Sequence, residues 1–260
     1  MGIAHTFREW SGQNQSVLAI SGQYCRGLQE AEIRELLSKN VVLLNGDAVS
    51  TLVQMGLGPL VGVKRADWLA SDSGVPSYEQ VTDGCTYAGL REGRLTAQAL
   101  TGDYLKIEHT GDVSVHTEVR NPSGETTGPG MAVVGKRLVL LPYGRSTGYL
   151  GLRHPVRQAL VQSLLSDLAR ERCPVFLENT ANIAVYAYDL GERRALLLAN
   201  ASNDDYDELR IGGIGSITEN AMEISSEGTR ALGRDLQHEG NRLVLKTGLR
   251  RFAVKALVFD

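Results

Sequence analysis

The sequence predicts a mixed protein in which an α/β domain with a parallel sheet is followed by an all-β domain. Short apolar runs alternate with helical patterns over residues 16–63, and period-two alternation dominates residues 96–119. Seven short strand-like runs then fill the chain after residue 173. Because 260 residues exceed what one small domain needs, we expect two domains, at residues 1–172 and 173–260.

The α/β domain opens with two strand–helix pairs. Val17–Ile20 is a short apolar run that ends at a Ser-Gly turn, and Leu28–Lys39 has the apolar side and charged side of an amphipathic helix. The apolar run Val41–Leu44 predicts a second buried strand. Asp47 follows where an N-cap would accept backbone N–H bonds, so we expect it to cap a helix over Ala48–Met55.

An antiparallel β insertion is expected at about residues 76–130 of the α/β domain. Runs of alternating polar and apolar residues, separated by Gly-Asp turns, indicate three hairpin strands: Thr96–Leu100, Tyr104–His109 and Val113–Val119. Leu138–Leu141 returns to a buried strand. Pro155 then opens a helix through Arg170, in which apolar residues recur every four positions.

The second domain is expected to be a small β-sandwich, because short strands separated by turn residues follow one another closely. The seven predicted strands are Val175–Glu178, Ile183–Tyr188, Arg194–Asn200, Glu208–Ile211, Ile217–Ile224, Arg242–Leu245 and Phe252–Phe259.

Charge and cysteine usage narrow the classes of partner. The net charge is −3 with no run of Lys or Arg, so we expect neither nucleic acid nor a membrane as partner. No apolar run approaches the length of a membrane helix, and Met1–Trp10 lacks the apolar core of a signal peptide. Cys25, Cys85 and Cys173 are scattered without CxxC spacing, which predicts a cytoplasmic, reducing location and no zinc site. No cofactor is expected.

Three residues are weak candidates for catalysis: Asp47, Cys25 and His154. Cys25 follows a strand, but the G-x-C-x-G elbow that would expose a nucleophilic thiol is absent. His154 begins the tripeptide His-Pro-Val, which lacks the glutamate that would orient an imidazole base. We therefore expect no catalytic residue. The alternative is a hydrolase or amidotransferase-like enzyme whose site gathers these three side chains at the carboxyl ends of the parallel strands.

Further histidine, acidic and aromatic residues could form a metal or carbohydrate site. His109 and His116 could meet across a hairpin, but without a third ligand a surface pair is expected rather than a metal site. The acidic run Asn203–Glu208 lacks a calcium-loop glycine and predicts a solvated hairpin tip. Exposed aromatic residues could bind carbohydrate, and the available ones are Trp10, Trp68, Tyr143, Tyr149, Tyr186 and Tyr188.

Several stretches together carry a family resemblance. They are residues 36–48 (LLSKNVVLLNGDA), 56–63 (GLGPLVGV), 135–143 (GKRLVLLPY), 174–178 (PVFLE) and 196–200 (LLLAN). This set resembles the C-terminal region of bacterial proteins related to glycoside hydrolases of the β-galactosidase type. The resemblance implies a partial, flavodoxin-like sheet of the class I glutamine-amidotransferase type without amidotransferase residues, followed by a terminal β-sandwich.

The resemblance also implies a role. In that family a catalytic (β/α)₈ barrel comes first, and its two carboxylates match no position here, so this chain alone is not expected to be an enzyme. The expected function is a non-catalytic accessory or oligomerisation module of a carbohydrate-active system, with a carbohydrate-binding protein as a further alternative. Met1–Phe7 resembles a late strand of the α/β domain, so we expect its opening βα units to be missing. A homo-oligomer or a (β/α)₈ barrel chain would then cover the flank of the sheet.

Overall fold

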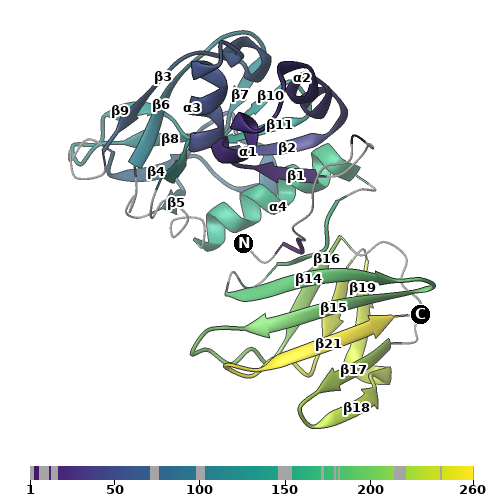
Figure 1. Cartoon of the computed structure of the whole chain (residues 1–260). Coiled ribbons are helices and arrows are strands. Elements are labelled where there is room, and N and C mark those ends of the chain that lie inside the picture. The colour runs from purple at the N-terminus through teal and green to yellow at the C-terminus, as the bar shows by residue number, and fades with distance from the viewer. Residues whose placement is uncertain are drawn as a thin grey trace. The chain divides into compact units, whose positions relative to one another are not determined.

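The computed structural model describes residues 3–5, 12, 17–70, 76–97, 103–145, 154–170, 173–178, 180, 182–213, 221–240 and 242–259. The chain divides into two compact units. The α/β unit is Trp10–Arg172, and the sandwich unit joins Met1–Glu9 to Cys173–Asp260. Figure 1 shows the α-helices in the first unit and mainly strands in the second, so the mixed fold class is confirmed in outline.

One mixed sheet organises the α/β unit, in the order β1-β2-β11-β10-β7. The first three strands are parallel, whereas β10 and β7 run antiparallel to their neighbours. The parallel strands are continuous apolar runs, as expected for strands covered on both faces. The strand bounds are β1 Val17–Ile20, β2 Val41–Asn45, β7 Val113–Val115, β10 Ala132–Val134 and β11 Leu138–Leu141.

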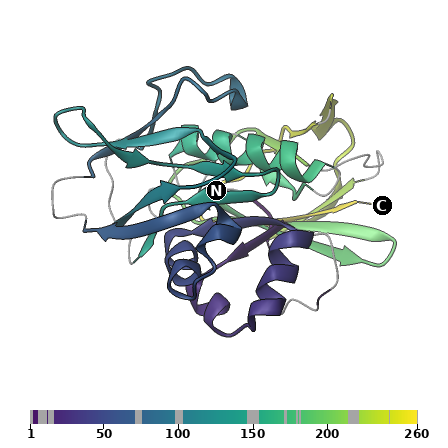
Figure 2. The same cartoon turned by 90° about the horizontal axis from the view of Figure 1, so that it is seen from above.

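Helices cover both faces of this sheet, with α1, α2 and α3 on one side and α4 on the other (Figure 2). Their bounds are α1 Gly22–Arg26, α2 Glu30–Lys39, α3 Gly46–Gln54 and α4 Pro155–Ala169. The predicted α4 is confirmed: proline occupies its first turn, and Leu160 and Leu164 are buried. The core beneath α2 and α3 joins Ile33 and Leu36 to Leu44 and Leu140 of the strands.

The sequence suggested that the insertion forms a hairpin sheet of its own, but its strands are shared among three sheets. Strand β7 joins the sheet of the parallel strands, and the other strands belong to two antiparallel sheets, β12-β6-β3 and β5-β4-β8-β9. The bounds are β3 Val63–Leu69, β4 Tyr78–Val81, β5 Leu95–Ala97, β6 Asp103–His109, β8 Thr117–Arg120, β9 Thr126–Pro129 and β12 Tyr143–Arg145.

The sandwich unit contains two antiparallel sheets, β13-β16-β20-β19 and β14-β15-β21-β17-β18. Leu209 and Leu243 of the first sheet share one buried cluster with Leu198 and Leu257 of the second. The bounds are β13 Phe176–Leu177, β14 Ile183–Leu190, β15 Arg193–Asn200, β16 Leu209–Gly212, β17 Ala221–Ser225, β18 Gly228–Ala231, β19 Leu236–Glu239, β20 Arg242–Leu245 and β21 Val254–Phe259. The sequence analysis missed β18 and β19.

The N-terminal segment lies with the sandwich unit and not with the α/β domain in which we placed it. Ile3 bridges Phe176, and the backbone N–H of Ala4 donates to the carbonyl of Val175 at 2.7 Å. Backbone pairing with β13 therefore assigns these residues to the second unit. Among the described residues, no helix combines the length and the apolar character that crossing a bilayer requires.

Candidate functional site

The carboxyl end of β2 is built by a helix cap. The side-chain Oδ1 of Asn45 accepts the backbone N–H of Ala48 at 2.9 Å, so α3 begins at Gly46. The prediction that Asp47 is the N-cap is therefore wrong. Asp47 lies in the first turn of α3, where its carboxylate is 4.0 Å from the guanidinium of Arg26. Its negative charge also interacts favourably with the positive end of the helix dipole.

Cys25 lies on α1 and is completely buried. Burial, followed by the nearby negative charge of Asp47, raises the pKa of the Cys25 thiol to about 11. The thiol is consequently protonated near neutral pH, whereas a nucleophilic cysteine needs a lowered pKa and an accessible sulfur. Its surroundings are those of a buried structural cysteine.

His154 lies at a different place in the unit. It is the N-cap of α4, with its Nδ1 3.3 Å from the backbone nitrogen of Val156. Burial lowers the pKa of His154, as do the positive charges of Arg157 and Arg94. The structure thus brings Cys25 beside Asp47 through the contact of α1 with α3, and it gives His154 a different set of charged neighbours.

Two glycines that follow β1 and β2 lie directly against packed side chains. A Cβ added at Gly46 would lie 2.8 Å from the Trp68 ring, and a Cβ at Gly22 would lie 2.4 Å from Oδ2 of Asp47. Trp68 is fixed there by its indole N–H, which donates to Ser50 Oγ at 3.2 Å. The two glycines therefore permit close approach where an open α/β sheet ordinarily leaves a ligand crevice.

A buried ion pair in the α/β unit escaped the sequence analysis. Glu79 of β4 and Arg157 of α4 both have completely buried side chains and contact each other directly. The carboxylate also accepts hydrogen bonds from Thr96 and Thr117, each at 2.6 Å. The Arg157 guanidinium lies 4.6 Å from the ring centroid of Tyr143. The only sequence signal was an arginine among the apolar positions of α4.

The charge of Glu79 is maintained by these partners. Burial by itself raises the pKa of a carboxyl group, but the Arg157 charge and the hydrogen bonds from Thr117 and Thr96 outweigh it and lower the pKa of Glu79. The group therefore stays ionised in the folded protein. A buried pair of this kind joins α4 to β4 and fixes their relative position.

The outer face of the second sandwich sheet is apolar. Core-facing residues of β14, β15, β17 and β21 alternate with outward-facing ones, and cross-strand pairing puts the outward ones in adjacent rows. We call this surface the apolar outer face. It is made of Ala184, Tyr186, Tyr188, Ala195, Leu197, Ala199, Met222, Ile224, Val254, Ala256 and Val258.

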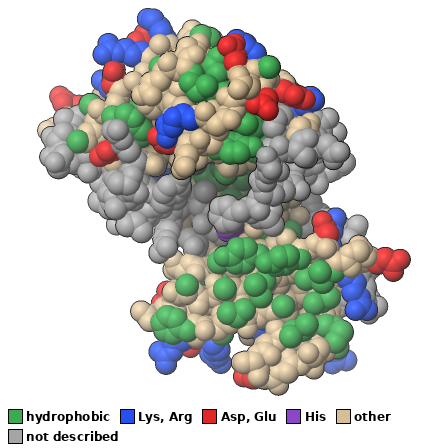
Figure 3. Space-filling model, in the orientation of Figure 1, with side chains coloured by type: hydrophobic (Ala, Val, Ile, Leu, Met, Phe, Trp, Pro, Cys, Tyr) green, Lys and Arg blue, Asp and Glu red, His purple; other side chains and the backbone are tan. Residues whose placement is uncertain are grey.

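Several of these side chains are strongly exposed: Val254 by 53%, Tyr188 by 47%, Ile224 by 44% and Met222 by 43%. Figure 3 shows hydrophobic side chains gathered over this sheet. With strands about 4.8 Å apart and alternate residues about 6.8 Å apart, four strands and three rows cover about 400 Å². A patch of that size matches the largest one on a typical monomer, which is often an interaction site.

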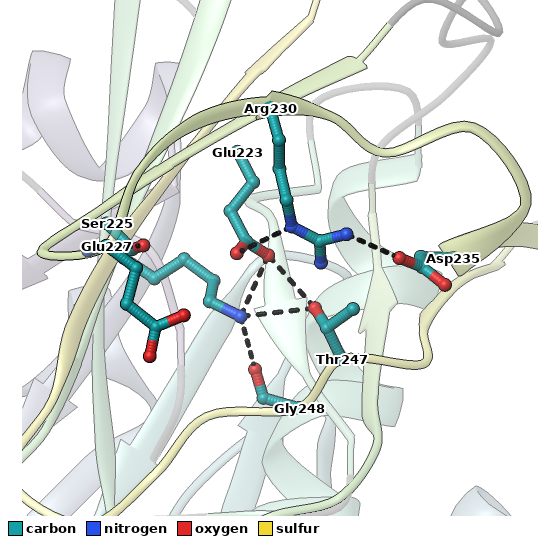
Figure 4. A network of polar contacts seen from close by, with 8 residues as sticks. Glu223, Ser225, Glu227, Arg230, Asp235, Thr247 and Gly248 are labelled. Carbon is teal, nitrogen blue, oxygen red and sulfur yellow. Dashed lines mark hydrogen bonds and ion pairs between the residues drawn. The ribbon is translucent and has the colours of Figure 1, made fainter.

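Charged groups lie on the opposite side of the same strands (Figure 4). Lys255 Nζ is 2.8 Å from the Glu223 carboxylate and donates to the carbonyl of Gly248 at 2.9 Å. Thr247 donates to Glu223 at 2.9 Å, and Arg230 links Glu223 to Asp235. Here β17 and β21 each carry one charged residue inward, Glu223 and Lys255, beside core residues such as Leu257, while their outward side chains are apolar rather than polar as on a usual solvated sheet face.

The structure also locates the histidines, the acidic run and the aromatic residues that the sequence offered as binding groups. His116 is buried, so the predicted surface pair with His109 is wrong, and the described residues contain no cluster of three potential metal ligands. The acidic run Asn203–Glu208 connects β15 to β16 in the other sheet, so it is not a hairpin tip. Trp10 and Tyr149 lie outside the described residues, Trp68 and Tyr143 are packed, and Tyr186 and Tyr188 belong to the apolar outer face.

Comparison with known proteins gives the following. No family model and no curated protein matches the sequence. A β-galactosidase from Bacillus circulans sp. alkalophilus aligns with 94% of this chain and 33% of its own, at 13% identity and a TM-score of 0.47. A β-galactosidase from Rahnella sp. R3 aligns with 95% of this chain and 41% of its own, at 11% identity and a TM-score of 0.44.

Gan42B, a GH42 β-galactosidase from G. stearothermophilus, aligns with 92% of this chain and 30% of its own, at 13% identity and a TM-score of 0.43. The chain thus spans between 30% and 41% of the length of these enzymes. All three TM-scores lie below one half.

Proposed function

We propose that this chain is a non-catalytic accessory or oligomerisation module of a carbohydrate-active, glycoside-hydrolase-like system. In this proposal the α/β unit is an amidotransferase-like domain that has no amidotransferase chemistry. The observation that carries it is the apolar outer face, which has the composition of a surface that another protein covers. The carbohydrate context comes from the sequence resemblance to β-galactosidase-type proteins.

The area of the face bears on the kind of assembly. Two copies paired face to face would bury about 800 Å² in total, which is the size of weak, transient contacts. A second copy of the chain is therefore expected to associate reversibly, whereas a stable complex requires a larger surface, such as that of a barrel chain. Either partner would remove Met222, Ile224 and Val254 from water.

Analytical ultracentrifugation over a wide range of concentration tests the proposal. The wild-type chain should associate as concentration rises, and Met222→Lys should weaken association by about tenfold or more because it buries a charge in the contact. Gln237→Lys is the matched control, since it adds the same charge to an exposed position of β19 in the other sheet. A wild-type chain that stays monomeric and gains no partner when mixed with a (β/α)₈ barrel chain would contradict the proposal.

Enzyme assays test the non-catalytic part. We expect no turnover of chromogenic glycosides or of glutamine, because the Cys25 thiol is buried and protonated and His154 lies among other charged groups. Turnover that disappears in Cys25→Ala or Asp47→Asn, with folding intact by circular dichroism, would instead establish the hydrolase or amidotransferase-like alternative.

Carbohydrate binding is a second candidate, favoured by the two tyrosines of β14. Tyr186 and Tyr188 face outward at alternate positions, and the ring of His5 lies 5.2 Å from that of Tyr186. Aromatic faces on an exposed sheet can stack on sugar rings. Titration with galacto-oligosaccharides separates the two candidates: sugar binding should be lost in Tyr188→Ala and retained in Met222→Lys, whereas a pure assembly surface binds no sugar.

A further inference from the structure

A cleft of about 710 Å³ lies in the α/β unit at the amino ends of β2 and β11. Five segments of the α/β unit line it, and its charged residues come from three of them: the end of α2 at Lys39, the turn between β10 and β11 at Lys136 and Arg137, and the end of α4 at Asp167 and Arg170. The other two contribute Tyr87 and His116. Its volume falls in the range of small-molecule sites.

Positive charge predominates in this cleft. Four cationic side chains line it, Lys39, Lys136, Arg137 and Arg170, against the single carboxylate of Asp167. Asp167 already accepts a hydrogen bond from the Tyr87 hydroxyl at 3.0 Å.

The charges of two of these cations, Lys39 and Arg170, are offset by neighbouring groups. Lys39 pairs with Glu35, and both Lys39 and Arg170 stand at helix C-termini, where a cation offsets the helix dipole. Lys136 and Arg137 have no such role, and within the described part of the chain neither forms an ion pair with a carboxylate. The surplus charge of the cleft is therefore about two.

A buried imidazole adds an independent observation. His116 lines the cleft with only 4% of its surface exposed, and neither of its ring nitrogens has a hydrogen-bond partner among the described residues. Its ring packs edge-on against Tyr87, with centroids 5.1 Å apart. A buried donor without a partner has lost its hydrogen bond to water and gained none in return. A ligand oxygen in the cleft would supply the missing partner.

We propose that this cleft binds a small dianion of the phosphate-monoester class, held by Lys136 and Arg137 and completed by a hydrogen bond from His116. The surplus of two charges matches a phosphate dianion better than a single carboxylate, and a guanidinium binds phosphate oxygens in a two-pronged geometry. The inference is independent of the role proposed for the apolar outer face, since the cleft is formed wholly by residues of the α/β unit.

Calorimetric titration of the full chain with inorganic phosphate, glucose 1-phosphate and glucose tests the proposal. Both phosphate probes should bind with a stoichiometry of one, and glucose should not. Arg137→Gln and Lys136→Gln should each weaken phosphate binding by about tenfold or more. Arg65→Gln, which removes the same charge from exposed β3, should leave binding unchanged.

His116 provides a readout that does not depend on net charge. Phosphate should shift the imidazole ¹⁵N resonances of His116, and His116→Phe should weaken binding without lowering the unfolding temperature, because it removes two unpaired nitrogens. Equal affinity for the two phosphate probes would mean that the site recognises the anion alone. Tighter binding of glucose 1-phosphate would mean that the site also contacts the sugar. Both results support the proposal.

Three results would overturn it: no saturable binding, glucose binding as tightly as glucose 1-phosphate, or equal weakening by Arg65→Gln and Arg137→Gln. The last would identify non-specific attraction by surface charge.

Discussion

Glu79 and Arg157 form the residue pair whose loss should cost the α/β unit most. Arg157→Met leaves an ionised carboxylate buried without its cation, so we expect a loss of about 3–5 kcal/mol in the free energy of unfolding. Urea unfolding followed by circular dichroism measures it. Arg34→Met is the control, because it breaks only the exposed pair with Glu30 and should cost less than about 0.5 kcal/mol.

The same carboxylate predicts how stability depends on pH. The folded-state pKa of Glu79 is lowered from its ordinary 4.5, so its contribution is fully present above pH 4.5 and is lost as pH falls through the folded-state value. Glu79→Gln should be less stable at neutral pH and should show a shallower loss on acidification. Identical acid transitions for the variant and the wild type, measured by tryptophan fluorescence, would contradict this.

The cap of α3 by Asn45 can be tested by substitution. Asn45→Ala should cost about 1 kcal/mol, because the backbone N–H of Ala48 loses its acceptor. Asp47→Ala removes only the 4.0 Å contact with exposed Arg26 and should cost less than about 0.5 kcal/mol. Chemical denaturation of the two variants compares them directly, and a larger loss in Asp47→Ala would reverse the assignment.

Sequence reasoning placed this cap two residues late for an identifiable reason. Asn45 and Asp47 are both good capping residues, and the sequence does not say where β2 stops being extended. The structure keeps Asn45 extended and pairs it with Leu141, so its side chain is the one that reaches the first turn of α3. Glu79 and Arg157 were missed because their meeting depends on packing between distant segments.

At the scale of elements, the contact of α1 with α3 depends on a missing side chain. Gly22→Ala would place a Cβ 2.4 Å from Asp47 Oδ2 and 2.6 Å from the Asp47 carbonyl oxygen, so we expect a loss of about 1–3 kcal/mol from displaced helices. Gly27→Ala is the matched control, because its Cβ would approach no atom closer than 3.4 Å. Thermal unfolding that is equal for the two variants would show that α1 shifts freely.

Periodicity determined which elements could be predicted. Long apolar stripes located α2 and α4, and continuous apolar runs located β2 and β11. In contrast, all of β18 is exposed, so it has no alternation to detect. The insertion strands were found, but their partners were not, because pairings such as β3 with β6 depend on contacts far apart in the chain.

At the scale of the whole molecule, each unit has its own hydrophobic core, so we expect two cooperative transitions in calorimetry. Leu44→Ala should lower one midpoint, and Leu198→Ala the other, since each truncates a completely buried side chain of a different core. A single transition shifted equally by both substitutions would mean that the units unfold together.

The position of β11 beside β2 has a consequence during synthesis. Val42 pairs with Leu138, so one edge of β2 stays open until the ribosome has released the whole stretch between them. At about 5–20 residues per second this interval lasts about 5–20 s. An apolar strand with an unpaired edge is prone to pair with other chains. Nascent chains that stall before Leu138 are therefore the ones expected to need chaperones.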